Sequence, residues 1–157
     1  MVSDKYRIYG AEMSPYSVKI RSYFRYKSIP YQWLQRMQHD EDFKKYARLP
    51  IIPLVVTPED EGIQDSTPII EKLEKIYPDP SIHPEDPTLA FLSALIEEFG
   101  DEWGNKLLFH HRWYSETDQV ASAHILARDV MPDADADTIG GLAEKIRNRM
   151  SGRGAFV

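Results

Sequence analysis

The chain contains 157 residues, of which 42% are hydrophobic and 28% are charged. This composition is typical of a globular protein with one ordinary domain or two small ones, and it excludes intrinsic disorder. The lack of cysteine excludes disulfides, cysteine-ligated zinc and thiol catalysis by the protein itself, and it fits a reducing cytoplasm. A net charge of −6 argues against a nucleic-acid partner. No apolar run has the length of a membrane span and the amino terminus lacks a signal-peptide core, so we expect a cytoplasmic protein without a membrane partner.

Strand and helix patterns alternate before residue 78. Short apolar runs rich in β-branched and aromatic residues predict strands at residues 5–9, 31–35, 51–56 and 63–64. Apolar residues at helical spacing predict helices at residues 16–26, 40–46 and 66–76. The predicted order is βαβαββα, which indicates an α/β domain.

A proline-rich stretch at residues 78–87 separates this region from a helical one. Prolines cannot donate to a hydrogen-bond ladder, so the stretch is typical of a stiff linker, and we place the domains at residues 1–80 and 81–157. Beyond it, apolar spacing predicts one long helix from Leu89 to Leu108, a second around residues 120–127 and a third around residues 139–150.

Ser14 is the first candidate for chemistry. It stands where the first strand gives way to a helix and is followed by Pro15, which suits the first helical position. Unpaired backbone N–H groups and the positive end of the helix dipole would then lie beside its hydroxyl, and they would stabilise an incoming thiolate. The alternative is that Ser14 only caps the helix.

Two further segments are candidates for ligand binding. A cis Ile52-Pro53 peptide would turn the backbone of Ile52 toward an extended ligand, whereas a trans bond would be ordinary. Asp65 precedes Ser66, which we expect to be a helix N-cap. This pair offers an acid for an ammonium group and N–H donors for a carboxylate, although capping alone also explains it.

Together these motifs resemble the thioredoxin-like amino-terminal domain of glutathione transferases. The likeness covers residues 5 to about 77. Ser14-Pro-Tyr-Ser17 is similar to the active-site loop of serine-type and omega-like members, with serine where glutaredoxins have two cysteines, so dithiol redox chemistry is excluded at this loop. Ile52-Pro53 is similar to the cis-proline element of the family, and Asp65-Ser66-Thr-Pro-Ile69 to its γ-glutamyl-binding motif.

The resemblance implies a thioredoxin-like α/β domain followed by an all-α domain that is short for the family. It also implies a cytoplasmic homodimer that binds glutathione as co-substrate, without a metal, and promotes attack of the glutathione sulfur on a small-molecule electrophile. Ser14 would be the catalytic residue. Glutathione would be bound by a set of residues near it: Tyr16, Ser17, Arg48, Ile52, Pro53, Asp65 and Ser66.

The sequence departs from the family at the glycine-carboxylate position, where Ile51 stands in place of the usual lysine. Arg48 or His39 are the candidates for the missing charge. The lost lysine and the short helical region favour an alternative, a non-catalytic protein that keeps the fold for binding or assembly. Acidic and histidine side chains between residues 97 and 116 are metal-ligand types, but a solvated helical face explains them more simply.

Overall fold

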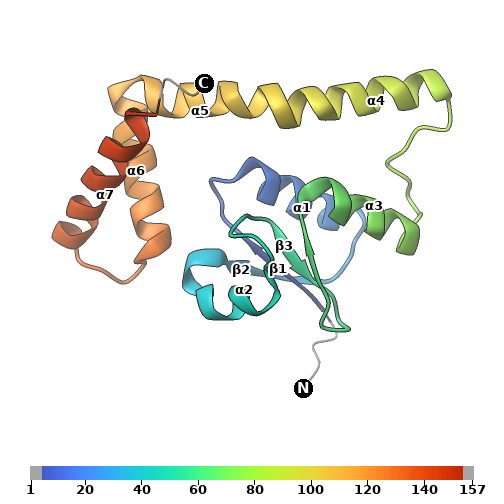
Figure 1. The fold of residues 1–157 in the computed structure, drawn as a ribbon, viewed down its shortest axis with the longest axis horizontal. Coiled ribbons are helices and arrows are strands. Elements are labelled where there is room, and N and C mark those ends of the chain that lie inside the picture. Colours follow the sequence, from blue (N-terminus) through green and yellow to red (C-terminus); the bar gives the residue numbers. More distant parts are fainter. Residues whose placement is uncertain (1–4, 154–157) are drawn as a thin grey trace. The chain divides into compact units, whose positions relative to one another are not determined.

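The computed structural model describes residues 5–153 (Figure 1). The chain divides into two compact units between Pro84 and Glu85. Each unit has its own apolar core.

The first unit is built on a four-stranded mixed sheet with the strand order β2-β1-β3-β4. β1 pairs with β2 in parallel and with β3 antiparallel, and β3 pairs antiparallel with β4. The parallel pair requires a crossover, which a helix between the two strands supplies. The strands are β1 (Tyr6–Gly10), β2 (Tyr31–Gln35), β3 (Leu54–Val56) and β4 (Gly62–Gln64).

Helices cover both faces of this sheet because the inward residues alternate along the strands. Ile8 and Val55 face a core shared with α1 (Pro15–Tyr26) and α3 (Ser66–Ile76). The opposite face, with Tyr9, Leu54 and Val56, packs on Phe43 of α2 (Asp40–Tyr46). A 3₁₀ turn, η1 (Arg36–Gln38), precedes α2.

The predicted α/β order is confirmed, with two corrections. The third strand begins at Leu54 and not at residue 51, because residues 48–51 bond to the Gln64 side chain and not to a neighbouring strand. Asp65, not Ser66, is the N-cap of α3, and Ser66 is the first helical residue. The predicted cis peptide at Ile52-Pro53 is confirmed, and Asp79-Pro80 is also cis.

The second unit is helical. The predicted long helix is present, but it extends to Tyr114 and contains a π-helical turn. A buried core of Trp113, Ala123, Ala127, Ile139 and Ala143 joins the last three helices. Within the described residues, no helix is long and apolar enough to cross a membrane. The elements are α4 (Pro87–Phe99), η2 (Gly100–Gly104), α5 (Asn105–Tyr114), α6 (Glu116–Val130) and α7 (Ala136–Ser151).

Candidate functional site

Strand register brings the three candidate segments to one end of the sheet. Tyr9 of β1 lies opposite Leu54 of β3, and Leu54 lies opposite Gln64 of β4. β1 ends here and leads to Ser14, β3 begins here directly after Pro53, and β4 ends here directly before Asp65. Segments that are distant in sequence therefore converge beside the amino-terminal end of α1.

Ser14 caps α1 as predicted. Its backbone is extended, Pro15 occupies the first turn, and its Oγ accepts a hydrogen bond from the backbone N–H of Ser17 at 3.3 Å. A hydroxyl has one donor hydrogen besides its acceptor lone pairs. Because Ser14 acts only as an acceptor in this cap, its O–H remains available to a ligand, so capping and thiolate stabilisation are compatible.

The loop before Ser14 is braced by an arginine on α1. Arg21 forms two charge-assisted hydrogen bonds with Glu12, one of them at 2.8 Å, and its guanidinium lies 4.4 Å from the centre of the Trp33 ring. The hydrogen bond from Arg21 lowers the pKa of the Glu12 carboxyl. A bidentate pair stacked on an aromatic ring has a defined geometry, so the turn that carries Ser14 is positioned from both sides.

Gly10 is required at the end of β1 because α1 approaches it closely. A Cβ at this position would lie 2.6 Å from the Trp33 ring and 2.9 Å from the Ser17 Cβ. Ser17 is fully buried by this contact, and its hydroxyl has no hydrogen-bond partner among residues 5–153. Ser17 therefore faces the sheet.

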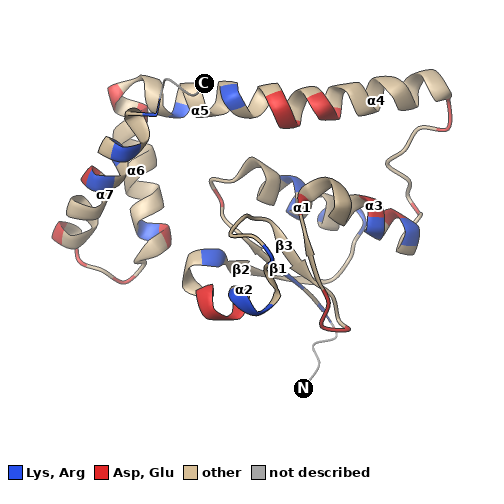
Figure 2. Ribbon diagram, viewed as in Figure 1, with Lys and Arg blue, Asp and Glu red and all other residues tan. Residues whose placement is uncertain are grey.

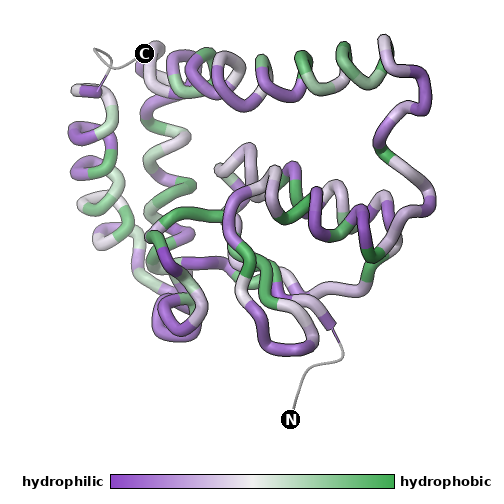
Figure 3. Tube along the Cα trace, turned by 45° about the vertical axis from the view of Figure 1, so that its right-hand side comes forward, coloured by the Kyte–Doolittle hydropathy of each residue, from purple (hydrophilic) through white to green (hydrophobic). Residues whose placement is uncertain are grey.

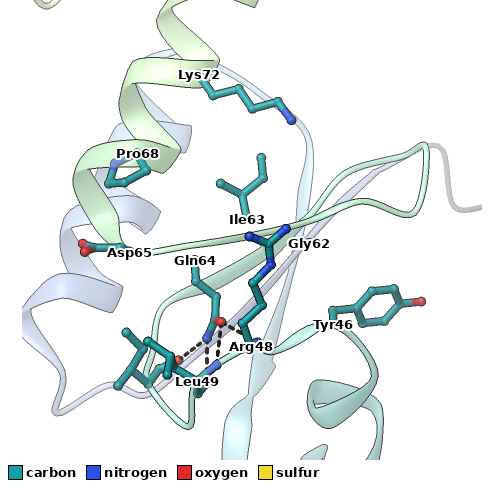
Figure 4. Close-up of a pocket in the computed structure, with 10 residues that line it drawn as sticks. Tyr46, Arg48, Leu49, Gly62, Ile63, Gln64, Asp65, Pro68 and Lys72 are labelled. Carbon is teal, nitrogen blue, oxygen red and sulfur yellow. Dashed lines mark hydrogen bonds between the residues drawn. The ribbon is translucent and has the colours of Figure 1, made fainter.

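Asp65 has an unusual backbone, and its side chain does not cap the helix that follows it. Its φ of 75° and ψ of 139° fall in a region that non-glycine residues rarely occupy. Its carboxylate makes no capping bond, is exposed, and points away from Arg48 (Figure 4). A strained residue whose side chain does nothing for its own helix indicates a role outside local folding.

Behind Asp65 lies an open pocket of about 380 Å³ (Figure 4). The Gln64 side chain forms its floor: the amide oxygen accepts from the N–H groups of Arg48 and Leu49 at 2.7 and 3.0 Å, and the amide nitrogen donates to the carbonyls of Leu49 and Ile51 at 2.8 and 3.0 Å. These four bonds use the full capacity of an amide side chain. Gln64 thus fixes the segment that leads into Ile52-Pro53.

Two cations line the same pocket. Lys72 is paired with Glu61 at 2.6 Å, whereas the Arg48 guanidinium forms no ion pair with another described residue. His39, the other candidate for the missing lysine charge, bonds through Nδ1 to the Gln35 carbonyl at 3.0 Å and does not line the pocket. Arg48 is therefore the cation available to a ligand carboxylate here.

The pocket itself includes two of the predicted site residues, Arg48 and Asp65. Ser14, Tyr16 and Ser17 belong to the start of α1, and the remaining three, Ile52, Pro53 and Ser66, lie at the same end of the sheet but outside the pocket lining. Sequence reasoning missed Gln64, whose position at the end of a short strand directly before Asp65 was the available signal. Within the described part of the chain, no group of three histidine or acidic side chains is arranged to hold a metal.

Comparison with protein families decides the relationship. Residues 8–81 match the family model described as glutathione S-transferase, N-terminal domain. This match places the domain of residues 8–81 in the glutathione S-transferase family. No curated protein matches the chain in sequence.

Solved structures of glutathione S-transferases share the fold. An enzyme from Methylobacterium radiotolerans, in complex with glutathione sulfonate, is 20% identical with a TM-score of 0.56, over 96% of this chain and 63% of its own. One from Rhodospirillum rubrum is 20% identical with a TM-score of 0.60, over 92% and 63%. The Tau-class enzyme of mango is 20% identical with a TM-score of 0.58, over 94% and 79%. The chain thus spans about 63% of the length of the first two glutathione S-transferases.

Proposed function

We propose that the chain binds glutathione through residues 1–80 and promotes attack of its sulfur on an electrophilic small molecule in the cytoplasm, as a serine-type or omega-like glutathione transferase. One observation carries this proposal: Ser14 Oγ accepts from the Ser17 N–H at the amino-terminal end of α1, and its O–H has no acceptor among residues 5–153. A helix N-terminus and a hydroxyl donor both favour the thiolate over the thiol.

The peptide of glutathione would lie across the end of the sheet. The backbone of Ile52 beside Pro53 would pair with the cysteinyl part, and Asp65 with Ser66 would bind the γ-glutamyl end. Arg48, with no ion pair of its own among the described residues, takes the glycine carboxylate in place of the lysine that Ile51 replaces. Tyr16 would lie in the first turn of α1 beside the sulfur, and Ser17 would act through its backbone N–H, which donates to Ser14 Oγ.

The reaction needs no covalent bond to the protein. The thiol proton passes to solvent, the thiolate sulfur forms a bond to the electrophilic atom, and the leaving group departs with its bonding electrons. A free thiol with a pKa of about 8.5 is mostly protonated at neutral pH, so a pKa lower by one or two units gives several-fold more thiolate. Ser14 supplies the hydrogen bond that strengthens as charge develops on the sulfur.

Titration of bound glutathione tests the proposal. The ultraviolet absorbance of the thiolate, measured against pH at saturating glutathione, should give a higher thiol pKa in Ser14→Ala, with turnover about 10- to 100-fold lower and little change in affinity. Ser115→Ala serves as the matched control, because Ser115 is also a serine N-cap whose Oγ accepts a backbone N–H, at the start of α6 in the second unit. Superimposable titrations of wild type and Ser14→Ala would leave Ser14 as a cap. No calorimetric binding at about 10 mM glutathione would instead support a non-catalytic binding or assembly role.

A further inference from the structure

The pocket behind Asp65 is larger than the glycine end of glutathione requires. Its volume of about 380 Å³ lies within the range of roughly 300–1,000 Å³ that is typical of sites for whole small molecules. The glycine of a bound glutathione offers one methylene group and a carboxylate, and these fill only part of this space. Asp65 and Arg48 belong both to the pocket and to the proposed peptide site, so the pocket adjoins the third residue of the peptide.

Apolar residues surround this space. Leu49 and Ile51 line the pocket and are 58% and 44% exposed, and Ile63 of β4 and Pro68 of α3 line it as well. Hydrophobic positions recur through residues 49–56, as the colouring of Figure 3 shows. Single exposed apolar side chains are normal on a protein surface, but several around one pocket are typical of a site that binds an apolar group.

The Gln64 amide satisfies the backbone groups beside these apolar side chains. It bonds the N–H and the carbonyl of Leu49 at 3.0 and 2.8 Å and the carbonyl of Ile51 at 3.0 Å. Because these backbone groups already have partners within the chain, Leu49 and Ile51 offer a ligand chiefly their apolar side chains. The same bonds hold both residues in place before a ligand binds, and a preorganised site loses less conformational freedom on binding.

Tyr46 forms a fixed wall of the same pocket. A Cβ at Gly62 would lie 2.9 Å from the Tyr46 Cβ and 3.0 Å from its carbonyl oxygen, so the end of α2 packs directly on β4. The Tyr46 hydroxyl donates to Asp60 at 2.6 Å and accepts from Arg7 at 3.2 Å. Tyr46 is therefore held at both its backbone and its hydroxyl, and the shape of the pocket does not depend on a ligand.

The charges around the pocket fit a single carboxylate. Arg48 forms no ion pair with another described residue, whereas Lys72 is paired with Glu61 at 2.6 Å. Figure 2 shows the acidic turn between β3 and β4 and the basic positions of α3 that this pair joins. The Asp65 carboxylate points away from Arg48 (Figure 4). The pocket therefore combines one available cation with an apolar surface.

We propose that this pocket binds the third residue of a thiol tripeptide that has an apolar side chain there in place of glycine. Arg48 binds the terminal carboxylate, and the apolar side chain lies against Leu49 and Ile51. This proposal rests on the proposed thiol-peptide site and names the class of peptide that suits it best. It also explains Ile51, because a lysine at this position would bring an ammonium group to the surface that the apolar side chain contacts.

Calorimetric titration of the full chain with two matched peptides tests the proposal: γ-Glu-Cys-Leu and glutathione, which is γ-Glu-Cys-Gly. Burial of one methylene group strengthens binding about fourfold, so partial burial of the leucine side chain should make the first peptide bind about tenfold more tightly. The amide of γ-Glu-Cys-Leu lacks the terminal carboxylate and should bind about tenfold more weakly than the acid, because the charge-assisted bond to Arg48 is lost.

Ile51→Lys tests the apolar wall of the pocket. It should lower the ratio of the affinities for γ-Glu-Cys-Leu and glutathione about tenfold, because a charge replaces the apolar contact. Ile76→Lys is the matched control, since Ile76 is 50% exposed on α3 outside the pocket lining, and it should leave the ratio unchanged. Both peptides are measured on the same variant, so the ratio does not depend on the fraction of folded protein.

The outcomes separate this proposal from the proposed function. Glutathione that binds as tightly as γ-Glu-Cys-Leu, an amide that binds as tightly as the acid, or an unchanged ratio in Ile51→Lys would each overturn the proposal and leave glutathione binding intact. No binding of either thiol peptide at about 10 mM would overturn both.

Discussion

Two features of Asp65 reduce the stability of the fold but suit the binding of a ligand. Its positive φ costs on the order of 1–3 kcal/mol in a non-glycine residue, and its carboxylate returns nothing to the helix it precedes. Glycine at this position would remove the strain at no steric cost. The native aspartate is therefore less favourable for folding than glycine, but it places a carboxylate at the end of β4.

Replacement of Asp65 should separate folding from binding. Asp65→Gly is expected to raise the free energy of unfolding by up to about 1–3 kcal/mol, because the backbone strain is removed. The same change should weaken glutathione affinity about 10- to 150-fold, because the γ-glutamyl ammonium loses a charged partner. Thermal melts and calorimetry measure the two effects. Asp65→Asn, which keeps the shape, should lose affinity without gaining stability, and unchanged affinity in both variants would show that Asp65 binds no ligand.

The Gln64 side chain holds residues 48–51 in place at the floor of the pocket. Its replacement by glutamate should disrupt this arrangement. Gln64→Glu removes both donated hydrogen bonds and sets a negative charge against the carbonyls of Leu49 and Ile51. We expect a loss of about 1–3 kcal/mol in unfolding free energy and weaker glutathione binding, since the segment between Arg48 and Ile52 loses the two bonds that Gln64 donates to it. Chemical denaturation and calorimetry would show this. The exposed Gln38→Glu is the control, and equal stability of the two variants would refute the role of Gln64.

At the scale of elements, a buried ion pair links α1, α3 and the following segment. Lys27 Nζ lies 2.5 Å from Glu74 Oε1 and donates to the Tyr77 carbonyl at 2.7 Å, and Glu74 also accepts from the Tyr23 hydroxyl at 2.7 Å. Burial opposes ionisation of Glu74, but the hydrogen bonds from Lys27 and Tyr23 outweigh it and leave the carboxyl pKa lowered. The pair joins both helices of one face to the segment that leaves the first unit.

Removing one member of this ion pair should lower the free energy of unfolding. Lys27→Met leaves the Glu74 charge buried, for which we expect a loss of about 3–5 kcal/mol in unfolding free energy. The double variant Lys27→Met with Glu74→Leu should recover part of that loss, because no uncompensated charge remains. Denaturant titrations of both variants and of the exposed Lys75→Met provide the comparison. A double variant less stable than Lys27→Met would contradict this interpretation.

The elements that sequence predicts well are those whose signals are local. The N-cap of α1 follows from Ser14 and Pro15, and β2 follows from the aromatic residues Tyr31 and Trp33 at alternate positions. The predicted start of β3 was wrong. Residues 51 and 52 are apolar enough for a strand, but the backbone of residues 48–51 forms hydrogen bonds with the Gln64 amide and not with another strand. No periodicity in a single sequence reports a hydrogen bond between residues 13 to 16 positions apart.

The same limit applies to the site and to the long helix. Ser14 and Pro53 were visible as motifs, but Arg48 and His39 could be separated only when the structure showed which of them lines the pocket. The π turn was also unpredictable, because apolar spacing of four residues fits both a straight α-helix and a widened turn. The N-cap of α3 was misassigned because aspartate and serine are both favoured at N-caps, so the sequence does not distinguish Asp65 from Ser66.

At the scale of the molecule, low pH should reduce the stability of the first unit more than that of the second. The carboxyls of Glu12 and Asp42 have pKa values lowered by hydrogen bonds from Arg21 and Tyr9, and Glu74 is lowered as described above. All three belong to the first unit, whereas the carboxyl with a lowered pKa in the second unit, Asp135, is an exposed helix cap. A carboxyl whose pKa is lower in the folded state stabilises the fold above its ordinary value, 4.5 for glutamate and 3.8 for aspartate, and that stability is lost as pH falls through the folded value.

We therefore expect the first unit to lose stability below about pH 4.5, ahead of the second unit. Burial also raises the pKa values of Tyr6, Tyr9 and Tyr23, so the unfolded chain ionises first and the same unit should weaken again above about pH 10. Urea titrations across this pH range, at constant ionic strength, measure the loss of stability at low pH and at high pH. If the urea midpoint of the first unit does not fall below about pH 4.5 or above about pH 10, these carboxyls and tyrosines do not control its stability.

The stacking of Arg21 on Trp33 gives such experiments a natural optical signal. Trp33 is the only tryptophan of residues 1–84, while Trp103 and Trp113 belong to the helical unit, so the fluorescence of each unit can be isolated by replacing the tryptophans of the other with phenylalanine. Trp33 touches the guanidinium that braces the turn of Ser14. Its emission should therefore change when a ligand reorders that turn, which would make glutathione occupancy visible in a cuvette without any added dye.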